Sequence, residues 1–371
     1  MIATELFAPG GVQRVGRELI DAITSGPAPL VTTPLVVWSL RDTEIGADYA
    51  LPAGTKSRFA AGSAVRLGAW AIARAATRCD DTQILLMHVH LAPIAVPMIV
   101  RGARVVPFLY GVEVWRPLTS VERFVLNRAA RVIAISEFTA QRFREANRWF
   151  RGAIDICPLG IPAESGSPAT PAESWRGHEA DRDWSLALIV SRISAEDRYK
   201  GHEPLIRAWA GIRERVPDAA LVAVGDGDDR PRLEALATEL GLDGAVRFVG
   251  CVSDRELAAW YARCAVFVMP SPDEGFGLVF LEAMRAGKPC IGAAGAAAEV
   301  IVDGVTGTIV PPGDEPALAD AIVELFRDPV RRTRLGHNGR ERFAHAFTSA
   351  HFADRVRHLL GARRPSENEA A

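Results

Sequence analysis

Lysine is almost missing from this chain of 371 residues: among 43 lysine and arginine residues, only Lys56, Lys200 and Lys288 are lysines. Cysteine is also sparse, and the five cysteines form no C-x-x-C pair. This spacing argues against a structural zinc site and a disulfide framework, and it suits a reducing compartment. Positive charge is not in excess either, because the net charge is −2. We therefore do not expect binding of nucleic acid through phosphate neutralisation.

Long hydrophobic runs are absent as well. The most apolar window, residues 84–100, contains two histidines and two prolines and is shorter than a membrane-spanning helix requires. The first residues, IATELFAPGG, lack the basic stretch that opens a secretory signal. We expect a soluble cytoplasmic protein that associates at most peripherally with the inner face of a membrane.

Two common catalytic motifs are missing. The chain contains neither G-x-x-x-x-G-K-S/T nor G-x-S-x-G, which argues against a P-loop nucleotide hydrolase and a serine hydrolase. Residues 225–237, GDGDDRPRLEALA, place glycines between a predicted strand and a predicted helix, but they do not form G-x-G-x-x-G. This segment alone is therefore weak support for a dinucleotide site.

Short apolar runs alternate with longer helical patterns along the whole chain, and continuous apolar runs are typical of parallel strands covered on both faces. The predicted strands are residues 2–7, 35–40, 84–89, 104–110, 132–136, 154–158, 186–192, 220–227, 246–250, 266–271, 288–293 and 308–312. One of the predicted helices covers residues 12–23, where apolar side chains share one face. This alternation predicts an α/β protein with two doubly wound, Rossmann-like domains facing across a cleft.

The segment 163–183 breaks the alternation, because it is rich in serine, proline, alanine and glutamate and has no periodicity. We interpret it as a linker between an N-terminal domain, residues 1–162, and a C-terminal domain, residues 184–345. Residues 346–362 are expected to form a helix that packs back toward the N-terminal domain, and residues 363–371 a disordered tail.

The strongest functional signal is the segment PSPDEGFGLVFLEAMRAGKPCIG, residues 270–292. A strand ends at Pro270, a loop rich in glycine follows, and a helix begins near Gly277. Gly275 and Gly277 let the backbone approach a ligand, and the first N–H groups of the helix suit an anion or a sugar hydroxyl.

Two glutamates of this segment are candidate ligands. Glu274 lies in the loop, and Glu282 lies in the helix. The alternative interpretation is that Glu274 complements the helix dipole and Glu282 is a surface residue. For Glu282 that alternative is weak, because the neighbouring positions are apolar: Leu278, Leu281 and Met284.

A second signal is VSRISAEDRYKGHEPLIRAW, residues 190–209. Arg192, Lys200 and the N-terminus of the following helix form a site for a doubly charged anion such as a diphosphate. Because arginine replaces lysine almost everywhere else, the retained Lys200 indicates a need for a compact ammonium group. A solvated loop remains the alternative.

These motifs resemble those of the retaining glycosyltransferases of family 4, the group 1 glycosyltransferases, which have the GT-B fold. The resemblance covers nearly the whole chain. It is carried by SR…RYKGH, VGDG, FVG…L…WY, EGFGLVFLE, GKP and VDGVTGTIVPPGD in the second half, and by GGVQRVGREL, HVHLAP, YGVEVW, ARVIAISEFT and PLGIP in the first.

The resemblance implies a donor site in the C-terminal domain and an acceptor site in the N-terminal domain. Arg192 and Lys200 would hold the diphosphate, Glu282 the ribose, and Glu274 the transferred sugar. The other donor-binding residues implied are glycines and backbone groups of the loops: Gly10, Gly11, Gly225, Gly275, Phe276, Gly277 and Leu278.

The implied reaction is the transfer of a hexose from a UDP- or GDP-sugar to a glycan or lipid-linked acceptor, with retention of configuration, in surface polysaccharide or glycolipid biosynthesis. Arg192, Lys200 and Glu274 are the implied catalytic residues. Fixed cations stabilise the charge on the departing diphosphate, so neither a metal nor a cofactor beyond the nucleotide sugar is expected. The alternative is a GT-B protein that binds nucleotide sugars without transfer, resembling an epimerase or serving as an accessory subunit.

The acceptor side departs from the family pattern. Tyr110 stands where many relatives carry a histidine, and tyrosine is a poor acid or base at neutral pH. His90, Tyr110 and Glu113 are the candidates for acceptor binding. His88 and His90 alternate at the end of a strand, so only one of them faces the cleft, and His90 is favoured by position.

The near-neutral total charge hides an asymmetry. Residues 1–160 carry 18 lysine and arginine against 13 acidic residues, so the first part of the chain is basic and the remainder acidic. In the basic part, arginines interleave with aromatic residues from Arg123 to Arg151. This pattern fits both a peripheral contact with an anionic membrane and an ordinary solvated face.

Overall fold

The computed structural model describes residues 1–8, 10–25, 34–46, 49–164 and 185–361. These residues divide into two compact units. Unit 1 comprises Met1–Gly160 and Ser349–Ala371, and unit 2 comprises Ile161–Thr348. The predicted linker at 163–183 lies outside the described residues except for its first two positions, and the predicted tail at 363–371 lies outside them entirely.

Unit 1 contains a seven-stranded sheet in the order β3-β2-β1-β4-β5-β6-β7. All neighbouring strands in it run parallel. The strands are β1 (Ile2–Ala3), β2 (Val36–Ser39), β3 (Lys56–Phe59), β4 (Gln83–Leu86), β5 (Arg104–Leu109), β6 (Val132–Ala134) and β7 (Ile154–Ile156). The order reverses between β1 and β4, as in a doubly wound sheet.

The edge strand β3 is not among the strands predicted from the sequence. Its residues, KSRF, are half-buried or exposed, and they pair only with β2. Because an edge strand is covered by one neighbour and partly by solvent, it needs no continuous apolar run. The rule that found the buried strands therefore could not find this one.

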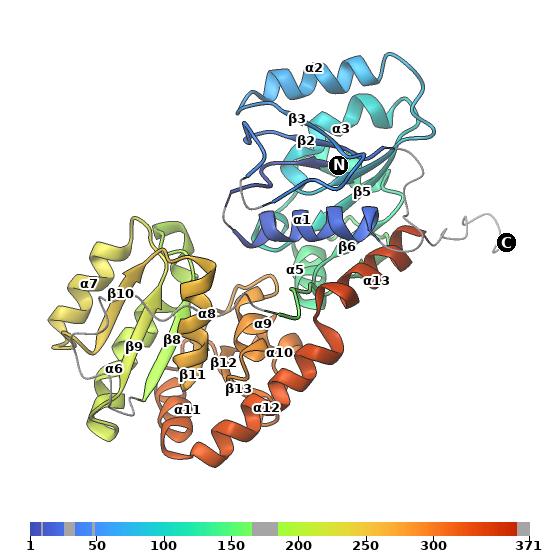
Figure 1. Ribbon diagram of the computed structural model, residues 1–371. Helices are drawn as coiled ribbons and strands as arrows, with labels where there is room; N and C mark the ends of the chain where they lie inside the picture. Colours follow the sequence, from blue (N-terminus) through green and yellow to red (C-terminus); the bar gives the residue numbers. More distant parts are fainter. Residues whose placement is uncertain (9, 26–33, 47–48, 165–184, 362–371) are drawn as a thin grey trace. The chain divides into compact units, whose positions relative to one another are not determined.

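Helices cover the sheet of unit 1 in two layers (Figure 1). The helices are α1 (Gly11–Thr24), α2 (Ala64–Arg74), α3 (Ala92–Ile99), α4 (Ser120–Asn127), α5 (Glu137–Ala146) and α13 (Ser349–Gly361). The helix predicted at 12–23 is confirmed as α1, whose Leu19 and Ile20 are fully buried.

The C-terminal helix α13 packs alongside α1. Arg357 of α13 donates a hydrogen bond of 2.8 Å to the carbonyl of Ser25, just after α1. Arg355 donates one of 3.1 Å to the carbonyl of Pro158. The chain thus returns to unit 1 after it completes unit 2.

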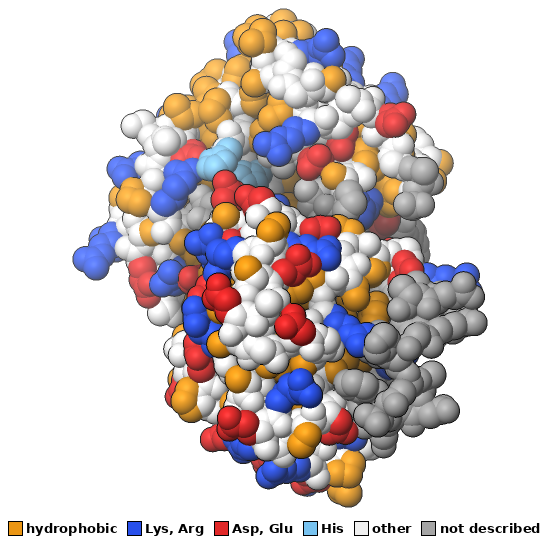
Figure 2. Space-filling model, turned by 90° about the vertical axis from the view of Figure 1, so that its left-hand side faces the viewer, with side chains coloured by type: hydrophobic (Ala, Val, Ile, Leu, Met, Phe, Trp, Pro, Cys, Tyr) orange, Lys and Arg blue, Asp and Glu red, His pale blue; other side chains and the backbone are white. Residues whose placement is uncertain are grey.

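The surface of unit 1 carries exposed apolar side chains. Val65 and Ile72 on α2 are 83% and 66% exposed, and Val100 after α3 is 62% exposed. Figure 2 shows hydrophobic side chains gathered with arginine and lysine at the top of the view, the end that carries α2 in Figure 1. A shallow groove between α3 and α4 is lined by Pro93, Val96, Ser120, Val121 and Phe124.

Unit 2 contains a six-stranded parallel sheet in the order β10-β9-β8-β11-β12-β13. The strands are β8 (Leu186–Val190), β9 (Ala220–Val224), β10 (Val246–Gly250), β11 (Val266–Met269), β12 (Cys290–Ala293) and β13 (Gly307–Val310). Every strand predicted from the sequence overlaps an observed strand, and the predicted pair of doubly wound α/β sheets is confirmed.

In unit 2 the loops that lead from strands to helices lie at the carboxyl edge of the sheet. The helices are α6 (His202–Arg215), α7 (Arg230–Glu239), α8 (Asp254–Arg263), α9 (Leu278–Arg285), α10 (Ala297–Val300), α11 (Glu315–Arg327) and α12 (Pro329–Ala346). Trp209 of α6 is fully buried and meets Phe326 of α11 edge to face, with ring centroids 6.4 Å apart. Because β9, β8 and β11 are neighbours, the loops that follow them emerge side by side.

Candidate functional site

The loops after β8 and β11 meet through an ion pair. Lys200 ends the short 3₁₀ helix η4 (Ala195–Lys200), and its ammonium group donates to Oε1 of Glu274. Both side chains are largely buried, with 18% and 10% exposed. The two candidates that the sequence placed on separate loops are therefore direct partners.

Gly201 makes this meeting possible. It has a φ of 85°, in the left-handed region. A Cβ atom at this position would lie 2.7 Å from Cγ of Pro270 and 3.0 Å from the carbonyl oxygen of Pro270. Only glycine therefore lets the end of η4 lie directly on the end of β11.

Arg192 is anchored within its own loop. Its Nε donates a hydrogen bond of 2.5 Å to Oδ2 of Asp197, which also accepts one of 2.6 Å from the hydroxyl of Ser194. Burial alone would raise the pKa of Asp197, but these hydrogen bonds outweigh it and hold the pKa below its usual value. The Arg192 side chain is nevertheless 73% exposed, so its guanidinium faces solvent while Asp197 anchors it.

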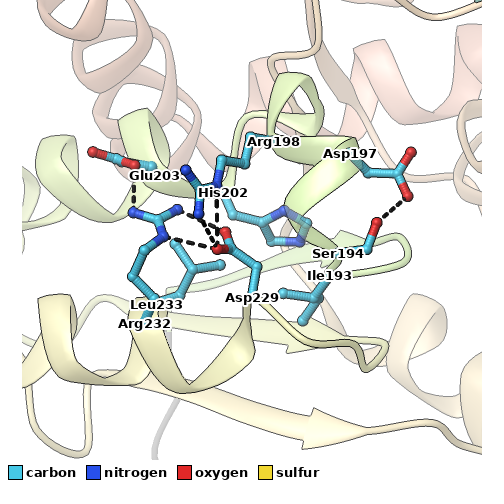
Figure 3. A pocket seen from close by; sticks show the side chains of 9 residues that line it. All are labelled: Ile193, Ser194, Asp197, Arg198, His202, Glu203, Asp229, Arg232 and Leu233. Atoms are coloured by element: carbon cyan, nitrogen blue, oxygen red, sulfur yellow. Dashed lines mark hydrogen bonds and ion pairs between the residues drawn. The ribbon is translucent and has the colours of Figure 1, made fainter.

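A second ion-pair network lies behind this loop (Figure 3). Arg232 donates to both carboxylate oxygens of Asp229 at 2.8 and 2.7 Å, and Arg198 of η4 donates to the same carboxylate at 2.9 Å. Hydrogen bonds from Arg232, and then from Arg198, lower the pKa of Asp229 to about 2, and they outweigh the opposite effect of its burial. Arg232 also reaches Glu203 of α6 at 2.6 Å. The network ties η4, between Arg192 and Lys200, to the starts of α6 and α7.

Glu282 faces the interior of unit 2 and not open solvent. It lies on α9 and is 9% exposed. Its Oε2 accepts a hydrogen bond of 2.9 Å from the hydroxyl of Tyr261, a buried residue of α8. The apolar neighbours that indicated burial in the sequence, Leu281 and Met284, are fully buried.

The loop before α9 is shaped by Gly277 and Phe276. Gly277 has a φ of 84°, and a Cβ atom there would lie 2.5 Å from the ring of Phe280. The Phe276 side chain is buried and packs against Phe347 with ring centroids 6.0 Å apart. Gly275 and Leu278 are only partly buried. The Phe276 ring therefore packs within unit 2 and is not available to a ligand.

Gly225 brings the end of β9 against the end of β8. Its N–H donates to the carbonyl of Gly250 at 2.9 Å, and a Cβ atom would lie 1.9 Å from the carbonyl oxygen of Ser191. The two following carboxylates, Asp226 and Asp228, are separated by one residue. They accept hydrogen bonds from the backbone N–H groups of Gly227, at 2.8 Å, and Ala195, at 2.9 Å.

The candidate site residues of unit 1 lie at the start of α1 and in the segments that follow β4 and β5. Gly10 caps α1 and Gly11 is its first residue, and both are exposed. His90 is exposed, and its backbone N–H donates to Nδ1 of His88 at 3.3 Å. Burial, and then the charge of His90, lowers the pKa of His88 to about 4, so His88 is neutral at pH 7. Of the two histidines, His90 is the exposed one.

Tyr110 lies in the core of unit 1. Its hydroxyl is 3.6 Å from the sulfur of Met87, and burial raises its pKa well above the usual value. Its ring stacks beside Phe108 at 6.4 Å. Its backbone N–H donates to Oε1 of Glu113 at 2.6 Å. Burial raises the pKa of Glu113 in spite of the backbone hydrogen bonds that it accepts. The Glu113 carboxylate thus closes the loop after β5.

The described residues contain neither a cluster of metal ligands nor a helix suited to cross a membrane. Within these ranges, no three histidine, cysteine, aspartate or glutamate side chains are grouped so that they could hold a metal ion. Among the helices of the same part of the chain, none is both long enough and apolar enough to cross a membrane.

Comparison with known proteins gives a family match in the second half of the chain. Residues 176–342 match the family described as glycosyl transferases group 1. A GDP-mannose-dependent alpha-(1-6)-phosphatidylinositol monomannoside mannosyltransferase of Mycolicibacterium smegmatis is 33% identical over 250 residues, which are 64% of this chain and 64% of that protein. A D-inositol 3-phosphate glycosyltransferase of Frankia alni is 36% identical over 192 residues, 49% of this chain and 46% of that protein. The matches therefore span less than two thirds of these relatives.

Solved structures resemble the chain along nearly its whole length. HepE from Anabaena, in complex with UDP and glucose, has a TM-score of 0.75 at 20% identity and covers 97% of this chain and 99% of its own. Sucrose-phosphate synthase from Thermosynechococcus elongatus has a TM-score of 0.77 at 24% identity, with 97% and 98% covered. At such identities the likeness establishes the fold, and the GT-B fold expected from the sequence is confirmed.

Proposed function

We propose that the protein is a group 1 glycosyltransferase that moves a hexose from a nucleotide sugar to a glycan or lipid-linked acceptor, since residues 176–342 match that family. The observation that carries the proposal is the loop cluster of unit 2. Arg192, Lys200, Glu274 and Gly225 lie on the neighbouring loops after β8, β11 and β9. Two cations and a carboxylate at this edge fit a diphosphate that bears a sugar.

The donor would replace contacts that the site now makes with itself. The ammonium of Lys200 would exchange its Glu274 partner for a diphosphate oxygen, and the exposed guanidinium of Arg192 would bind a second oxygen. Glu274, released, would accept hydrogen bonds from sugar hydroxyls. Glu282 would accept hydrogen bonds from the ribose hydroxyls. The backbone of 275–278 would complete the sugar pocket.

We propose that the transfer retains configuration and needs no metal. The bond between the anomeric carbon and the diphosphate oxygen breaks as the acceptor hydroxyl forms its new bond on the same face. The hydroxyl proton passes to the departing diphosphate, so no protein nucleophile is required. Lys200 and Arg192 stabilise the negative charge that develops on the leaving group. Their fixed positions cost no reorganisation during the reaction.

The relatives suggest which donor and acceptor to test first. Curated relatives are GDP-mannose-dependent transferases acting on a phosphatidylinositol monomannoside, and the HepE structure holds UDP and glucose. The test is an assay of the full chain with labelled GDP-mannose and UDP-glucose and a lipid extract as acceptor. Transfer of label to lipid or glycan supports the proposal. Nucleotide binding with no transfer from either donor would instead favour a protein that binds nucleotide sugars without transferring them.

We further propose that unit 1 contacts a membrane surface. Support comes from the exposed Val65 and Ile72 of α2 and from arginines that stack on aromatic rings, such as Arg128 over Phe124 at 4.0 Å. Replacing both apolar residues with aspartate should reduce sedimentation with anionic phospholipid vesicles. Val330→Asp, at a 78% exposed valine of unit 2, is the matched control and should sediment as the unmodified protein does. Equal sedimentation of all variants would contradict this proposal.

A further inference from the structure

A buried tyrosine holds the second glutamate of the candidate site. Tyr261 on α8 is 2% exposed. Its hydroxyl lies 2.9 Å from Oε2 of Glu282 and 3.3 Å from the carbonyl oxygen of Val279. A hydroxyl has one proton to donate, and the nearer, carboxylate oxygen is the stronger acceptor. The hydrogen bond therefore joins α8 to α9 through the Glu282 side chain.

The tyrosine itself is rigidly placed. Its ring lies 5.7 Å from the ring of Phe267 on β11, which in turn meets Phe280 of α9 edge to face at 5.5 Å. Phe267 and Phe280 are fully buried. Burial, and then the Glu282 charge, raises the pKa of the Tyr261 hydroxyl well above its usual value. The hydroxyl is thus a permanent donor at any pH at which the protein functions.

The geometry points to Tyr261 as a positioning residue for the nucleotide: it fixes the Glu282 carboxylate in the orientation that receives the ribose hydroxyls. This inference rests on the proposed function, in which Glu282 binds the ribose. A glutamate side chain has several rotamers, and a carboxylate held at one oxygen loses much of that freedom before the ligand arrives. Fixing the carboxylate in advance lowers the entropic cost of binding.

The experiment uses Tyr261→Phe, which keeps the ring and removes only the hydroxyl. Affinity is measured for GDP and UDP and for the 2′,3′-dideoxy form of whichever binds, which lacks the hydroxyls that Glu282 would receive. We expect about a tenfold loss of affinity for the ordinary nucleotide, equivalent to about 1.4 kcal/mol, and an unchanged affinity for the dideoxy form. In the transfer assay, the donor KM should rise while kcat stays near that of the unmodified protein.

Tyr49→Phe is the matched control. The Tyr49 hydroxyl donates to a carboxylate in the same way, at 2.8 Å to Asp21, but in unit 1. This variant loses an equivalent hydrogen bond and should bind the nucleotide as the unmodified protein does.

Three results would overturn the inference. If Tyr261→Phe weakens the ordinary and the dideoxy nucleotide equally, Tyr261 has only a structural role. If the unmodified protein does not distinguish the two nucleotides, Glu282 does not bind the ribose, although transfer can still be measured and the proposed function can still hold. If neither GDP nor UDP binds, the donor site itself is wrong and the proposed function fails with the inference.

Discussion

Lys200 and Glu274, which are 74 positions apart in the sequence, form an ion pair at the carboxyl edge of the unit 2 sheet. Each group is mostly buried, and each is the partner that compensates the other's loss of water. A ligand that replaces Glu274 as the partner of the Lys200 ammonium must therefore supply negative charge. A ligand that replaces Lys200 as the partner of the Glu274 carboxylate must supply hydroxyl donors. A sugar diphosphate supplies both at once.

Removing the Lys200 ammonium should abolish transfer without unfolding the chain. For Lys200→Ala we expect a fall in kcat/KM on the order of 100-fold or more, because a fixed cation at the leaving group is lost. Lys200→Arg should also be impaired, since a planar guanidinium does not occupy the space of a compact ammonium. The measurement is initial rate with the preferred donor, together with circular dichroism to verify folding.

Lys56→Ala is the control for this change. Lys56 is another of the three lysines, exposed on the edge strand β3 of unit 1. Its loss should leave the rate unchanged. Near-normal transfer by Lys200→Ala would show that this ammonium does not assist the leaving group.

The acceptor candidates of unit 1 should differ sharply. Tyr110→Phe should leave transfer nearly unchanged, because the hydroxyl that it removes is buried against Met87. His90→Ala should raise the acceptor KM about tenfold and leave the donor KM unchanged, since His90 is exposed and lies in the unit expected to bind the acceptor. Steady-state kinetics with each substrate varied in turn test both. A large effect of Tyr110→Phe would mean that the hydroxyl reaches the substrate.

The buried His202 should make the protein less stable in acid. Burial, and then the charge of Lys200, lowers its pKa from 6.5 to about 4. Below about pH 6.5 the unfolded chain therefore binds a proton at this histidine, whereas the folded chain binds it only below about pH 4. The free energy of unfolding is thus unaffected above about pH 6.5 and falls as the pH decreases from about 6.5 to about 4. The upper limit of this fall is about 3 kcal/mol.

Urea unfolding at about pH 7.5 and about pH 5 measures this effect. His202→Gln should narrow the difference in the free energy of unfolding between the two conditions. His337→Gln, at an exposed histidine of α12, should leave the difference as it is in the unmodified protein. An unchanged difference in His202→Gln would show that the histidine is not held neutral.

The sequence was sufficient to predict two doubly wound parallel sheets, and it placed Arg192 and Lys200 on the loop after β8 and Glu274 on the loop after β11. Continuous apolar runs predict buried parallel strands. The loops that follow neighbouring parallel strands lie at the same, carboxyl edge of the sheet. The edge strand β3 could not be found in this way, because its KSRF sequence has no apolar continuity.

Contacts between particular side chains could not be predicted from the sequence. Trp260 and Tyr261 entered the sequence analysis only as the WY of a family motif, and nothing in that motif showed that the Tyr261 hydroxyl reaches Glu282. Nor could the sequence show that the Tyr110 hydroxyl turns into the core, since a tyrosine after a strand fits a cleft equally well. Both depend on packing between elements that are distant in the chain.

We propose above that the loops of unit 2 bind a nucleoside diphosphate, with Lys200 at the diphosphate and Glu282 at the ribose. Calorimetric titration of the full chain with GDP and with UDP tests it most directly, alongside Lys200→Ala and Glu282→Ala. We predict saturable one-to-one binding of at least one nucleotide, with an affinity at least about tenfold lower in each variant. Failure of both nucleotides to bind, or equal affinity in all three proteins, would contradict it.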